Sequence, residues 1–341
     1  MTEPFSWAHT LSHILSGKSL DERAAADAMT EIMEGAATPA QVAGFVVALR
    51  ARGETAEELV GLVRTMRSYA GKVEAGEDVL DTCGTGGDRA GTFNVSTAAA
   101  LVCAGAGAKV AKHGNRAASS RCGSADVLEA LGVKIDLPSA GVEECIAEAG
   151  IGFCFAPVFH PAMRHAGAPR RELGIATVFN FLGPLTNPAG ARFQALGVAD
   201  PRMLELMVEA LGRLGSKRVI AFHGHGGLDE LATSGPSTVV ELVGGEIRRW
   251  TLEPGDLGLA PAPIEAISGG SADENAAAVR AVLSGDSGPR RDIVVLNAAA
   301  GLVAAGHATD MGSGMIRAAE AIDSGAATAA LERLVHTSNA V

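Results

Sequence analysis

A glycine-rich segment at residues 81–97 carries the strongest chemical signal in the sequence. It reads Asp-Thr-Cys-Gly-Thr-Gly-Gly-Asp over residues 81–88, and Thr-Phe-Asn-Val-Ser-Thr follows over residues 92–97. Glycines let backbone amides converge on an anion without obstruction by side chains. Ser96 and Thr97 open a predicted helix, whose first amides and dipole also favour an anion. We interpret the segment as a phosphate site, although a structural turn capped by Asn94 or Ser96 would use similar residues.

A second segment, Lys-His-Gly-Asn-Arg-Ala-Ala-Ser-Ser at residues 112–120, follows a predicted strand. Lys112 and Arg116 supply positive charge, and Ser119 and Ser120 supply hydroxyls for phosphate oxygens. Ligands of open α/β sheets bind at the carboxyl ends of the strands, so both segments are expected at the same edge of the sheet. A solvated basic loop is the alternative interpretation, but two such segments at one edge favour a binding site.

Three further sites have side chains suited to ligands. The planar guanidinium of Arg170 matches a carboxylate in bidentate fashion, and the adjacent Arg171 offers the same chemistry. The neighbouring acids Asp229 and Glu230 suit magnesium, which usually takes one or two carboxylates, although adjacent acids in a loop are commonly just solvated. His223 and His225 flank one glycine, but no third ligand of the kind zinc needs lies nearby, so we interpret them as part of a loop.

The elements that must position these residues follow from hydrophobic periodicity and capping signals. The first 70 residues are predicted to form helices alone, with capping boxes beginning at Thr38 and Thr55. Beyond them, short apolar runs alternate with helical patterns, which predicts a parallel sheet with crossover helices. A Gly244-Gly245 pair between two further apolar runs predicts a hairpin. The strands are expected near residues 79–81, 109–111, 151–156, 195–198 and 218–222, and the hairpin over 238–250.

The expected fold class is α/β, with a small all-helical domain and a large α/β domain that has a mainly parallel central sheet. A chain of 341 residues favours two domains. Residues 161–186 interrupt the strand–helix alternation and are expected to return to the helical part. The predicted division is therefore 1–73 with about 163–190 for the helical domain, on the side of the acceptor substrate, and 74–162 with 191–341 for the α/β domain.

Composition narrows the class of partner. A net charge of −11 and a pI near 5.3 argue against binding to nucleic acid or to an anionic membrane surface. The longest apolar run, about residues 293–306, is interrupted by Asn297 and is shorter than the ~20 residues that span a bilayer. The five cysteines include no Cys-x-x-Cys pair, which predicts reduced thiols and a cytoplasmic protein.

Taken together, the two loop segments resemble those of the anthranilate phosphoribosyltransferases. The resemblance continues in order with Arg-Arg-Glu-Leu-Gly at 170–174, Phe-Asn-Phe-Leu-Gly-Pro-Leu-Thr-Asn-Pro at 179–188 and Gly-Leu-Asp-Glu at 227–230. It implies transfer of a phosphoribosyl group from phosphoribosyl pyrophosphate (PRPP) to the amine of anthranilate, giving N-(5-phosphoribosyl)anthranilate and pyrophosphate in tryptophan biosynthesis. It also implies Mg²⁺ as the cofactor, with two ions per subunit, and a homodimer formed through the helical domain.

The resemblance also implies a role for each matching position. His113 is the candidate for handling a proton or orienting a substrate; an aromatic amine is neutral and nucleophilic at pH 7, so no strong general base is required. The metal ligands would be Ser96, Asp229 and Glu230, and anthranilate would contact Gly84, His113, Asn115 and Arg170. The PRPP site would comprise Gly84, Gly86, Gly87, Asp88, Thr92, Asn94, Val95, Ser96, Thr97, Lys112, Asn115, Arg116, Ala117, Ala118, Ser119, Ser120 and Ser124.

Two positions depart from the family pattern, and two other functions remain open. Arg89 stands where the family often has glycine, and Ala176 stands where it commonly has arginine, near the expected acceptor site. One alternative is an enzyme like the pyrimidine nucleoside phosphorylases, with inorganic phosphate as the nucleophile. The other is a non-catalytic relative that binds nucleic acid, which the negative charge disfavours.

Overall fold

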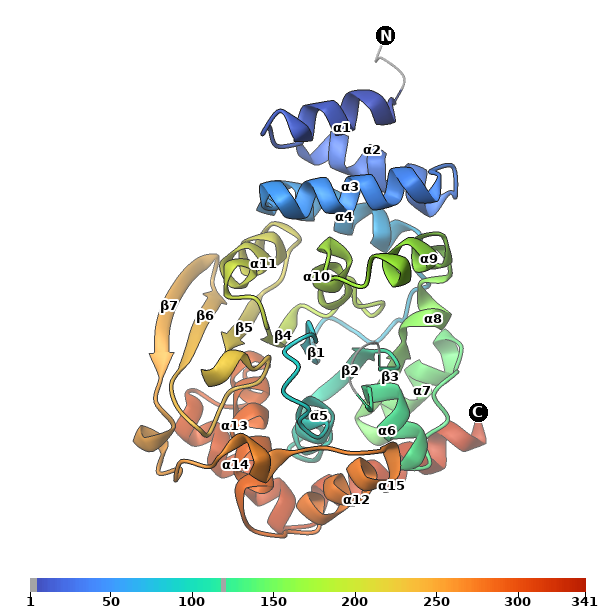
Figure 1. Ribbon diagram of the computed structural model, residues 1–341. Coiled ribbons are helices and arrows are strands. Elements are labelled where there is room, and N and C mark those ends of the chain that lie inside the picture. The colour runs from blue at the N-terminus through green and yellow to red at the C-terminus, as the bar shows by residue number, and fades with distance from the viewer. Residues whose placement is uncertain (1–4, 118–120) are drawn as a thin grey trace.

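The computed structural model describes residues 5–117 and 121–341 (Figure 1). Its N-terminal part consists of helices, as predicted: α1 (Trp7–Leu15), α2 (Glu22–Met33), α3 (Pro39–Arg52) and α4 (Ala56–Ser68). Capping boxes at Thr38 and Thr55 open α3 and α4: each threonine hydroxyl accepts a hydrogen bond from the amide three residues later, and the side chain of that residue accepts one from the amide of the threonine. The predicted helical start of the chain is confirmed.

A seven-stranded sheet forms the centre of the rest of the molecule, in the order β3-β2-β1-β4-β5-β6-β7. Neighbours among β1 to β5 are parallel, and β6 and β7 join antiparallel as the predicted hairpin. The mainly parallel sheet is thereby confirmed. The strands are β1 (Val79–Gly84), β2 (Lys109–Gly114), β3 (Ile151–Phe155), β4 (Phe193–Gly197), β5 (Arg218–His223), β6 (Ser237–Val243) and β7 (Glu246–Leu252).

Strand β2 is longer than expected. It continues to Gly114, and Lys112 and His113 pair with Phe153 and Cys154 of β3. The prediction that Lys112 and His113 belong to the loop after the strand is therefore wrong. The apolar residues of this strand end at Ala111. The hydrophobic pattern alone therefore could not indicate that the next two residues, which are polar, continue the hydrogen bonding with β3.

Helices surround the sheet, and none in the described ranges has the length and apolar character needed to cross a membrane. The α-helices after the first four are α5 (Val95–Gly105), α6 (Ser124–Ala130), α7 (Ser139–Ala149), α8 (Ala156–Phe159), α9 (Arg164–Leu173), α10 (Val178–Leu185), α11 (Pro201–Arg213), α12 (Ala272–Leu283), α13 (Pro289–Ala304), α14 (Met311–Asp323) and α15 (Ala326–Ala340). Short 3₁₀ helices lie at Pro161–Met163, His225–Gly227, Pro254–Leu257 and Ile264–Ile267.

The two faces of the sheet are covered by different apolar clusters. On one face, Leu80 and Ile220 pack in a cluster that includes α5 and α13. On the other face, Leu196 and Ala221 share a cluster with α10, α11 and the N-terminal helices. Helices α9 and α10 also contact α2 to α4, so the chain returns to the helical part after β3. Figure 1 shows the N-terminal helices above the sheet and α12 to α15 on its opposite side.

The strand order creates a crevice at one edge of the sheet. The chain moves from β1 to β2 and β3 on one side, and β4 and β5 then lie on the other side of β1. At such a reversal, the crossover connections leave in opposite directions and open a crevice at the carboxyl ends of the two middle strands. Here those ends are Gly84 of β1 and Gly197 of β4, which are direct neighbours in the register.

A buried carboxylate fixes the helical part, and its removal tests that part's stability. Glu58 is fully buried, accepts hydrogen bonds from the amides of Leu20 (2.8 Å) and Thr55 (2.9 Å), and pairs with Arg52. We expect Glu58→Ala to lower the free energy of unfolding by about 3 kcal/mol, because it removes the carboxylate partner of the largely buried Arg52 guanidinium and the acceptor of the buried Leu20 amide. Urea titration followed by circular dichroism measures this.

The control is Glu57→Ala, which removes an exposed carboxylate from the same helical turn. Its effect should stay within about 0.5 kcal/mol. Equal effects of the two substitutions would contradict the structural role assigned to Glu58.

Candidate active site

Glycines at the ends of β1 and β4 make room for the acidic pair. A Cβ atom on Gly84 would lie 2.4 Å from Oδ2 of Asp229, and one on Gly197 would lie 1.6 Å from the Asp229 carbonyl oxygen. Side chains do not tolerate such distances, so the loop that carries Asp229 can lie across these strand ends because both residues are glycine. The crevice predicted by topology is thus where the acids are found.

The two acids accept hydrogen bonds from the amides that the sequence predicted as phosphate ligands. Oδ2 of Asp229 lies 2.7 Å from the amide nitrogen of Gly86, and Oε1 of Glu230 lies 3.1 Å from that of Ser96. The first amide belongs to the glycine-rich loop and the second to the first turn of α5. Segments more than 130 positions apart in the chain therefore meet at one point.

Carboxylates crowd this point. Burial and the charge of Asp88 raise the pKa of Asp229, while burial and the charge of Asp229 raise the pKa of Glu230 against the opposing effect of Lys112. Oδ2 of Asp88 is buried and has no hydrogen-bond partner among the described residues. A bound cation would relieve this repulsion, and oxygen donors are the ligands that Mg²⁺ prefers.

The site is not a complete metal cage by itself. Within residues 5–117 and 121–341, no group of three or more His, Cys, Asp or Glu side chains is arranged to hold a metal ion. The remaining ligands must then come from a hydroxyl such as that of Ser96, from water or from a bound substrate. His223 and His225 do not contribute, since their Nδ1 atoms contact the Val198 carbonyl (2.8 Å) and the Ser234 hydroxyl (3.2 Å).

Lys112 lies beneath the crevice and not in a surface loop. Its side chain is 2% exposed, and Nζ donates to the carbonyl of Thr82 (2.6 Å) and approaches the hydroxyl of Ser96 (3.4 Å). Burial lowers the pKa of Lys112, whereas the charges of Asp81 and Glu230 raise it. A buried cation next to Glu230 and Ser96 can thus orient these groups and offset part of their negative charge.

His113 lies beside a second histidine that the sequence analysis missed. The ring centroids of His113 and His160 are 5.1 Å apart, both side chains are buried, and Nδ1 of His113 lies 3.2 Å from the Gly183 carbonyl. Burial is the main cause that lowers the pKa of His113 to about 3 and that of His160 to about 4. Both rings are therefore neutral at pH 7, and they can act through hydrogen bonds but not as cations.

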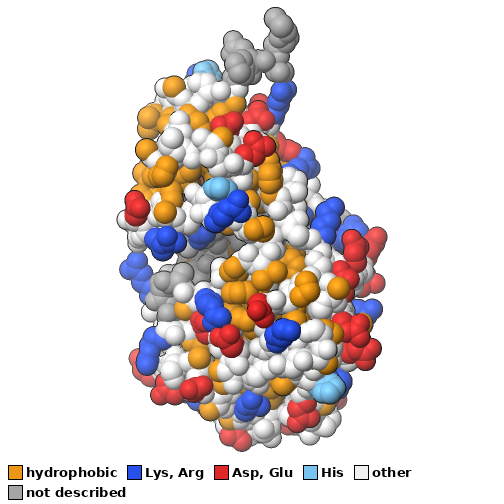
Figure 2. All heavy atoms as spheres, turned by 90° about the vertical axis from the view of Figure 1, so that its right-hand side faces the viewer, with side chains coloured by type: hydrophobic (Ala, Val, Ile, Leu, Met, Phe, Trp, Pro, Cys, Tyr) orange, Lys and Arg blue, Asp and Glu red, His pale blue; other side chains and the backbone are white. Residues whose placement is uncertain are grey.

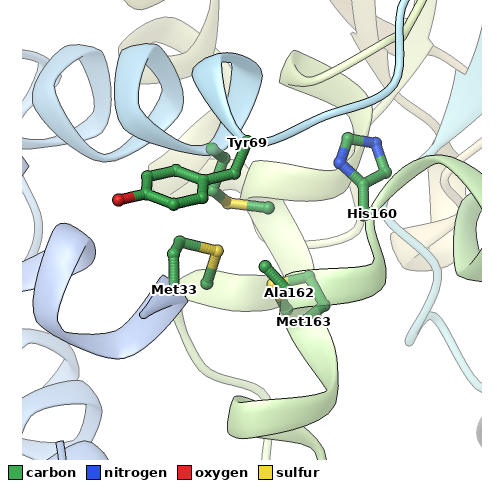
Figure 3. Close-up of a pocket in the computed structure, with 6 residues that line it drawn as sticks. Met33, Tyr69, His160, Ala162 and Met163 are labelled. Carbon is green, nitrogen blue, oxygen red and sulfur yellow. The ribbon is translucent and has the colours of Figure 1, made fainter. Parts of the chain in front are cut away.

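His160 also lines a small pocket between the helical part and the segment after β3 (Figure 3). The other lining residues are Met33, Met66, Tyr69, Ala162 and Met163. Figure 3 shows Met33 next to the Tyr69 ring, His160 on the other side of the pocket, and Ala162 and Met163 below. No motif surrounds His160 in the sequence, and nothing there indicated that it lies beside His113. The two rings meet because the segment after β3 lies next to the end of β2.

The second predicted segment is described in part. The side-chain oxygen of Asn115 accepts a hydrogen bond from the amide of Arg116 (2.7 Å). The hydroxyl of Ser124, the first residue of α6, donates to the Asn115 carbonyl (3.3 Å). The guanidinium of Arg116 pairs with Asp126 and Glu129, and the amide of Ala117 also donates to Asp126. The predicted ligands Ala118, Ser119 and Ser120 lie outside the described residues.

Asn94 links the two segments to a part of the chain that no motif indicated. Its Nδ2 donates to the Cys122 carbonyl (3.3 Å), and its Oδ1 accepts from Nδ2 of Asn275 in α12 (2.9 Å). Thr92 forms an isolated bridge with Ser268. Residues 268–275 therefore brace the first candidate phosphate loop, which periodicity could not show because the contact joins positions about 180 residues apart.

The remaining predicted residues complete the first turn of α5 and its loop. Val95 and Thr97 are buried, and the Thr97 hydroxyl has no partner among the described residues. Gly86 and Gly87 have φ of 67° and 85°. Arg89 has φ of 57°, and in the described ranges it is the one non-glycine residue with a positive φ, which explains why glycine suits this position.

Arg170 lies on α9, half-buried, with its guanidinium 5.3 Å from the ring centroid of Phe179. Burial lowers its pKa. No ion pair involves it in the part of the chain that the structure describes, whereas Arg171 and Ala176 are exposed. On the face drawn in Figure 2, the surface is hollowed between the helical part and the α/β part, with basic side chains at the border of the hollow.

Comparison with known proteins identifies the parts of the chain. Residues 76–328 match the model for the α/β domain of a glycosyl transferase family, and residues 8–70 match its helical bundle domain. The anthranilate phosphoribosyltransferase of Roseiflexus castenholzii is 58% identical over 96% of this chain and 96% of its own length. That of Chloroflexus aggregans is 54% identical over 96% of this chain and 97% of its own.

Solved structures agree with these relatives. The crystal structure of anthranilate phosphoribosyltransferase from Thermus thermophilus superposes with a TM-score of 0.91 at 47% identity, over 97% of this chain and 99% of that chain. The enzyme from Saccharomyces cerevisiae in complex with PRPP and Mg gives a TM-score of 0.90 at 29% identity, over 98% of both chains.

The fit of the acidic loop over β4 can be tested by adding one methyl group. Gly197→Ala would place a Cβ atom against the Asp229 carbonyl and force the loop with both acids away from the amides of Gly86 and Ser96. We expect turnover in the reaction of these relatives to fall at least about 100-fold, since shifts near 1 Å have costs of that size. Steady-state kinetics measures the loss.

Gly255→Ala is the matched control, because a Cβ atom there would meet no atom within 4 Å. Its turnover should equal that of the unmodified protein. Retention of full activity by Gly197→Ala would show that the position of the acidic loop is not critical.

Proposed function

Since this chain belongs to the anthranilate phosphoribosyltransferase family, we propose that it transfers the phosphoribosyl group of PRPP to the amine of anthranilate, as an enzyme of tryptophan biosynthesis, through the site at the ends of β1 and β4. One observation carries the proposal: Asp229 and Glu230 accept hydrogen bonds from the amides of Gly86 and Ser96. This contact joins a candidate cation site to a candidate phosphate site.

We infer that the phosphates of PRPP take over these amides. The glycine-rich loop and the first turn of α5 offer backbone donors, and Lys112 places positive charge directly below them. Asn94 and Thr92 then brace the loop, while Gly84, Gly87 and Asp88 shape it. Asn115 to Ser120 and Ser124 would contribute from the neighbouring strand end, with Arg116 leaving Asp126 and Glu129 to meet the phosphate.

Magnesium fits the released carboxylates. Asp229, Glu230 and the hydroxyl of Ser96 supply oxygen donors, and mutual repulsion of the acids favours a cation between them. When bound, Mg²⁺ neutralises the charge that develops on the leaving pyrophosphate. Two ions per subunit remain the proposal, since two carboxylates and the oxygens of pyrophosphate provide enough ligands. The yeast relative in complex with PRPP and Mg supports the use of this metal.

Anthranilate would bind on the side of the helical domain. Arg170 is free of carboxylate partners in the described structure and can hold the anthranilate carboxylate in bidentate fashion. His113 is neutral and buried, so it suits an orienting hydrogen bond, and Gly84 and Asn115 complete the contacts. A structure of the yeast relative contains 4-fluoroanthranilate, which supports an acceptor of this shape.

The reaction then needs little proton transfer. The anomeric carbon loses its bond to the pyrophosphate oxygen and gains a bond to the anthranilate nitrogen, and the nitrogen afterwards releases a proton. Such centres react through oxocarbenium-like transition states, which are sensitive to position and charge. The site residues would therefore act mainly by holding both substrates and by stabilising the leaving group.

The domain division and the cellular location belong to the same proposal. The helical domain would comprise residues 1–73 and about 163–190, and the α/β domain 74–162 and 191–341, which is supported by the packing of α9 and α10 on the N-terminal helices. All five cysteines are buried, and no disulfide joins any of them within residues 5–117 and 121–341, which supports a reducing compartment such as the cytoplasm. The charge of −11 supports small-molecule substrates over nucleic acid.

The reaction is tested by the fluorescence of anthranilate. Its signal should fall only when protein, PRPP and Mg²⁺ are all present, and chelation of the metal should stop the change. Arg170→Ala should raise KM for anthranilate about tenfold or more and leave KM for PRPP within about twofold, because one charged hydrogen-bonding partner of the acceptor is lost.

Arg171→Ala, at the exposed neighbouring position, should leave both constants unchanged. A change in KM for PRPP of the same size as that for anthranilate would contradict the assignment of Arg170. Phosphorolysis of a pyrimidine nucleoside without turnover of anthranilate would favour the phosphorylase alternative.

The proposed homodimer is tested on the exposed apolar surface of the helical domain. Leu15 of α1 is 77% exposed and Val47 of α3 is 38% exposed. We expect the unmodified protein to have the mass of a dimer in light scattering, and Leu15→Glu with Val47→Glu to give monomers, since buried like charges disfavour association. Ile316→Glu on α14, which is 62% exposed, serves as the control and should stay dimeric.

A further inference from the structure

Asn297 is the polar residue that interrupts the longest apolar run of the sequence. It lies in the middle of α13, a helix whose residues from Ile293 to Ala304 are all buried, and it is 3% exposed. A primary amide in such surroundings is costly unless its donors and acceptor are all engaged. The side-chain oxygen and both amide hydrogens of Asn297 therefore need hydrogen-bond partners.

Two of the three hydrogen bonds of Asn297 leave the helix and reach the loop of the acidic pair. Oδ1 of Asn297 accepts the amide of Leu231 at 2.9 Å, and Nδ2 donates to the carbonyl of the same residue at 3.0 Å. The second hydrogen of Nδ2 reaches the carbonyl of Ile293 at 2.8 Å, one turn back in α13. The side-chain amide of Asn297 thus pairs with both the N–H and the C=O of Leu231, as the backbone of a neighbouring strand would. Its third hydrogen bond fixes the side chain to α13.

Leu231 directly follows Asp229 and Glu230, in a segment with no helix or strand of its own. The segment is held on both sides, because the Gly224 amide donates to the Leu228 carbonyl (2.8 Å) and the Ala232 amide donates to the Ser237 hydroxyl (3.1 Å). Asn297 supplies the anchor directly after the acids, as the bond from Gly224 to Leu228 supplies the one directly before them. Backbone hydrogen bonds of a regular element cannot perform this task here.

The short side chains of the acids make the backbone anchor important. Asp and Glu reach only a few bonds from the main chain, so a displacement at Leu231 moves the carboxylates by a similar amount. Ligand sets tolerate displacements of roughly 0.5 Å before binding weakens. The tight fit of the Glu230 carbonyl, 2.1 Å from where a Cβ atom on Gly224 would lie, leaves little other freedom in the segment.

We propose that Asn297 is a positioning residue for the magnesium-binding carboxylates, acting through its two hydrogen bonds to the backbone of Leu231. It touches neither substrate nor metal in this role. The inference rests on the proposed function, because it assumes that Asp229 and Glu230 hold Mg²⁺. It adds a residue from α13, a helix that carries none of the site positions predicted from the sequence.

The test compares Asn297→Leu, which keeps the size of the side chain and removes all three hydrogen bonds, with Val303→Ala in the same helix. Val303→Ala removes core packing at a buried position and serves as the control for lost stability. Calorimetry gives the affinity of Mg²⁺ for each protein saturated with pyrophosphate, and kinetics gives the half-saturating Mg²⁺ concentration and KM for anthranilate. Thermal melting reports the stability of each variant.

We expect Asn297→Leu to bind Mg²⁺ about tenfold to 100-fold more weakly than the unmodified protein, with KM for anthranilate unchanged. Val303→Ala should melt earlier but bind Mg²⁺ normally. Should Asn297→Leu fail to fold, Asn297→Ala carries the same test, since it removes the same bonds without adding volume. Mg²⁺ affinity within about twofold of that of Val303→Ala would overturn the inference and leave a purely structural role.

The unmodified protein separates this result from a failure of the proposed function. If it binds pyrophosphate but no Mg²⁺, the proposed metal site is wrong and the inference falls with it. If it binds Mg²⁺ and the Asn297 variants do so equally well, the inference alone is overturned.

Discussion

The hydrogen bonds from the amides of Gly86 and Ser96 to the carboxylates of Asp229 and Glu230 determine what the rest of the structure must provide. They require a loop after β1, the start of α5 and a loop beyond β5 to meet at one point. The amides proposed to bind phosphate and the acids proposed to bind Mg²⁺ form hydrogen bonds with each other at that point. In a substrate that carries pyrophosphate and a metal ion, the phosphate oxygens suit the amides and the metal ion suits the carboxylates.

Close approach of backbone to backbone is the main geometric condition for that contact. The reversal of strand order places β1 beside β4, and glycine at both strand ends lets the acidic loop cross them. A parallel sheet gives the loops a common edge, but the edge would be closed by side chains if Gly84 or Gly197 were any other residue. The fold supplies the crevice and these residues keep it open.

Buried polar groups then hold the site from below and behind. Lys112 lies under Ser96, Asn275 holds Asn94, and Asn297 holds Leu231. Each of these three side chains is buried, where unpaired donors are costly, so each remains fixed to its partner. Positions that appear as interruptions of hydrophobic runs are, in the folded chain, the supports of loops that have no regular structure.

The sequence by itself determined the helical start, the parallel sheet with its hairpin, and the loops that carry the glycines and the acids, because these depend on local periodicity, capping and residue type. Tertiary structure alone decided that Lys112 and His113 lie in a strand and are buried, that His160 lies beside His113, and that Asn275 and Asn297 brace the site. The tertiary structure also showed that Asp229 and Glu230 accept hydrogen bonds from amides that were predicted to bind phosphate. The physical reason is that each of these facts joins positions distant in the chain, and the energy of a polar group depends on the burial and partners that the folded neighbours supply.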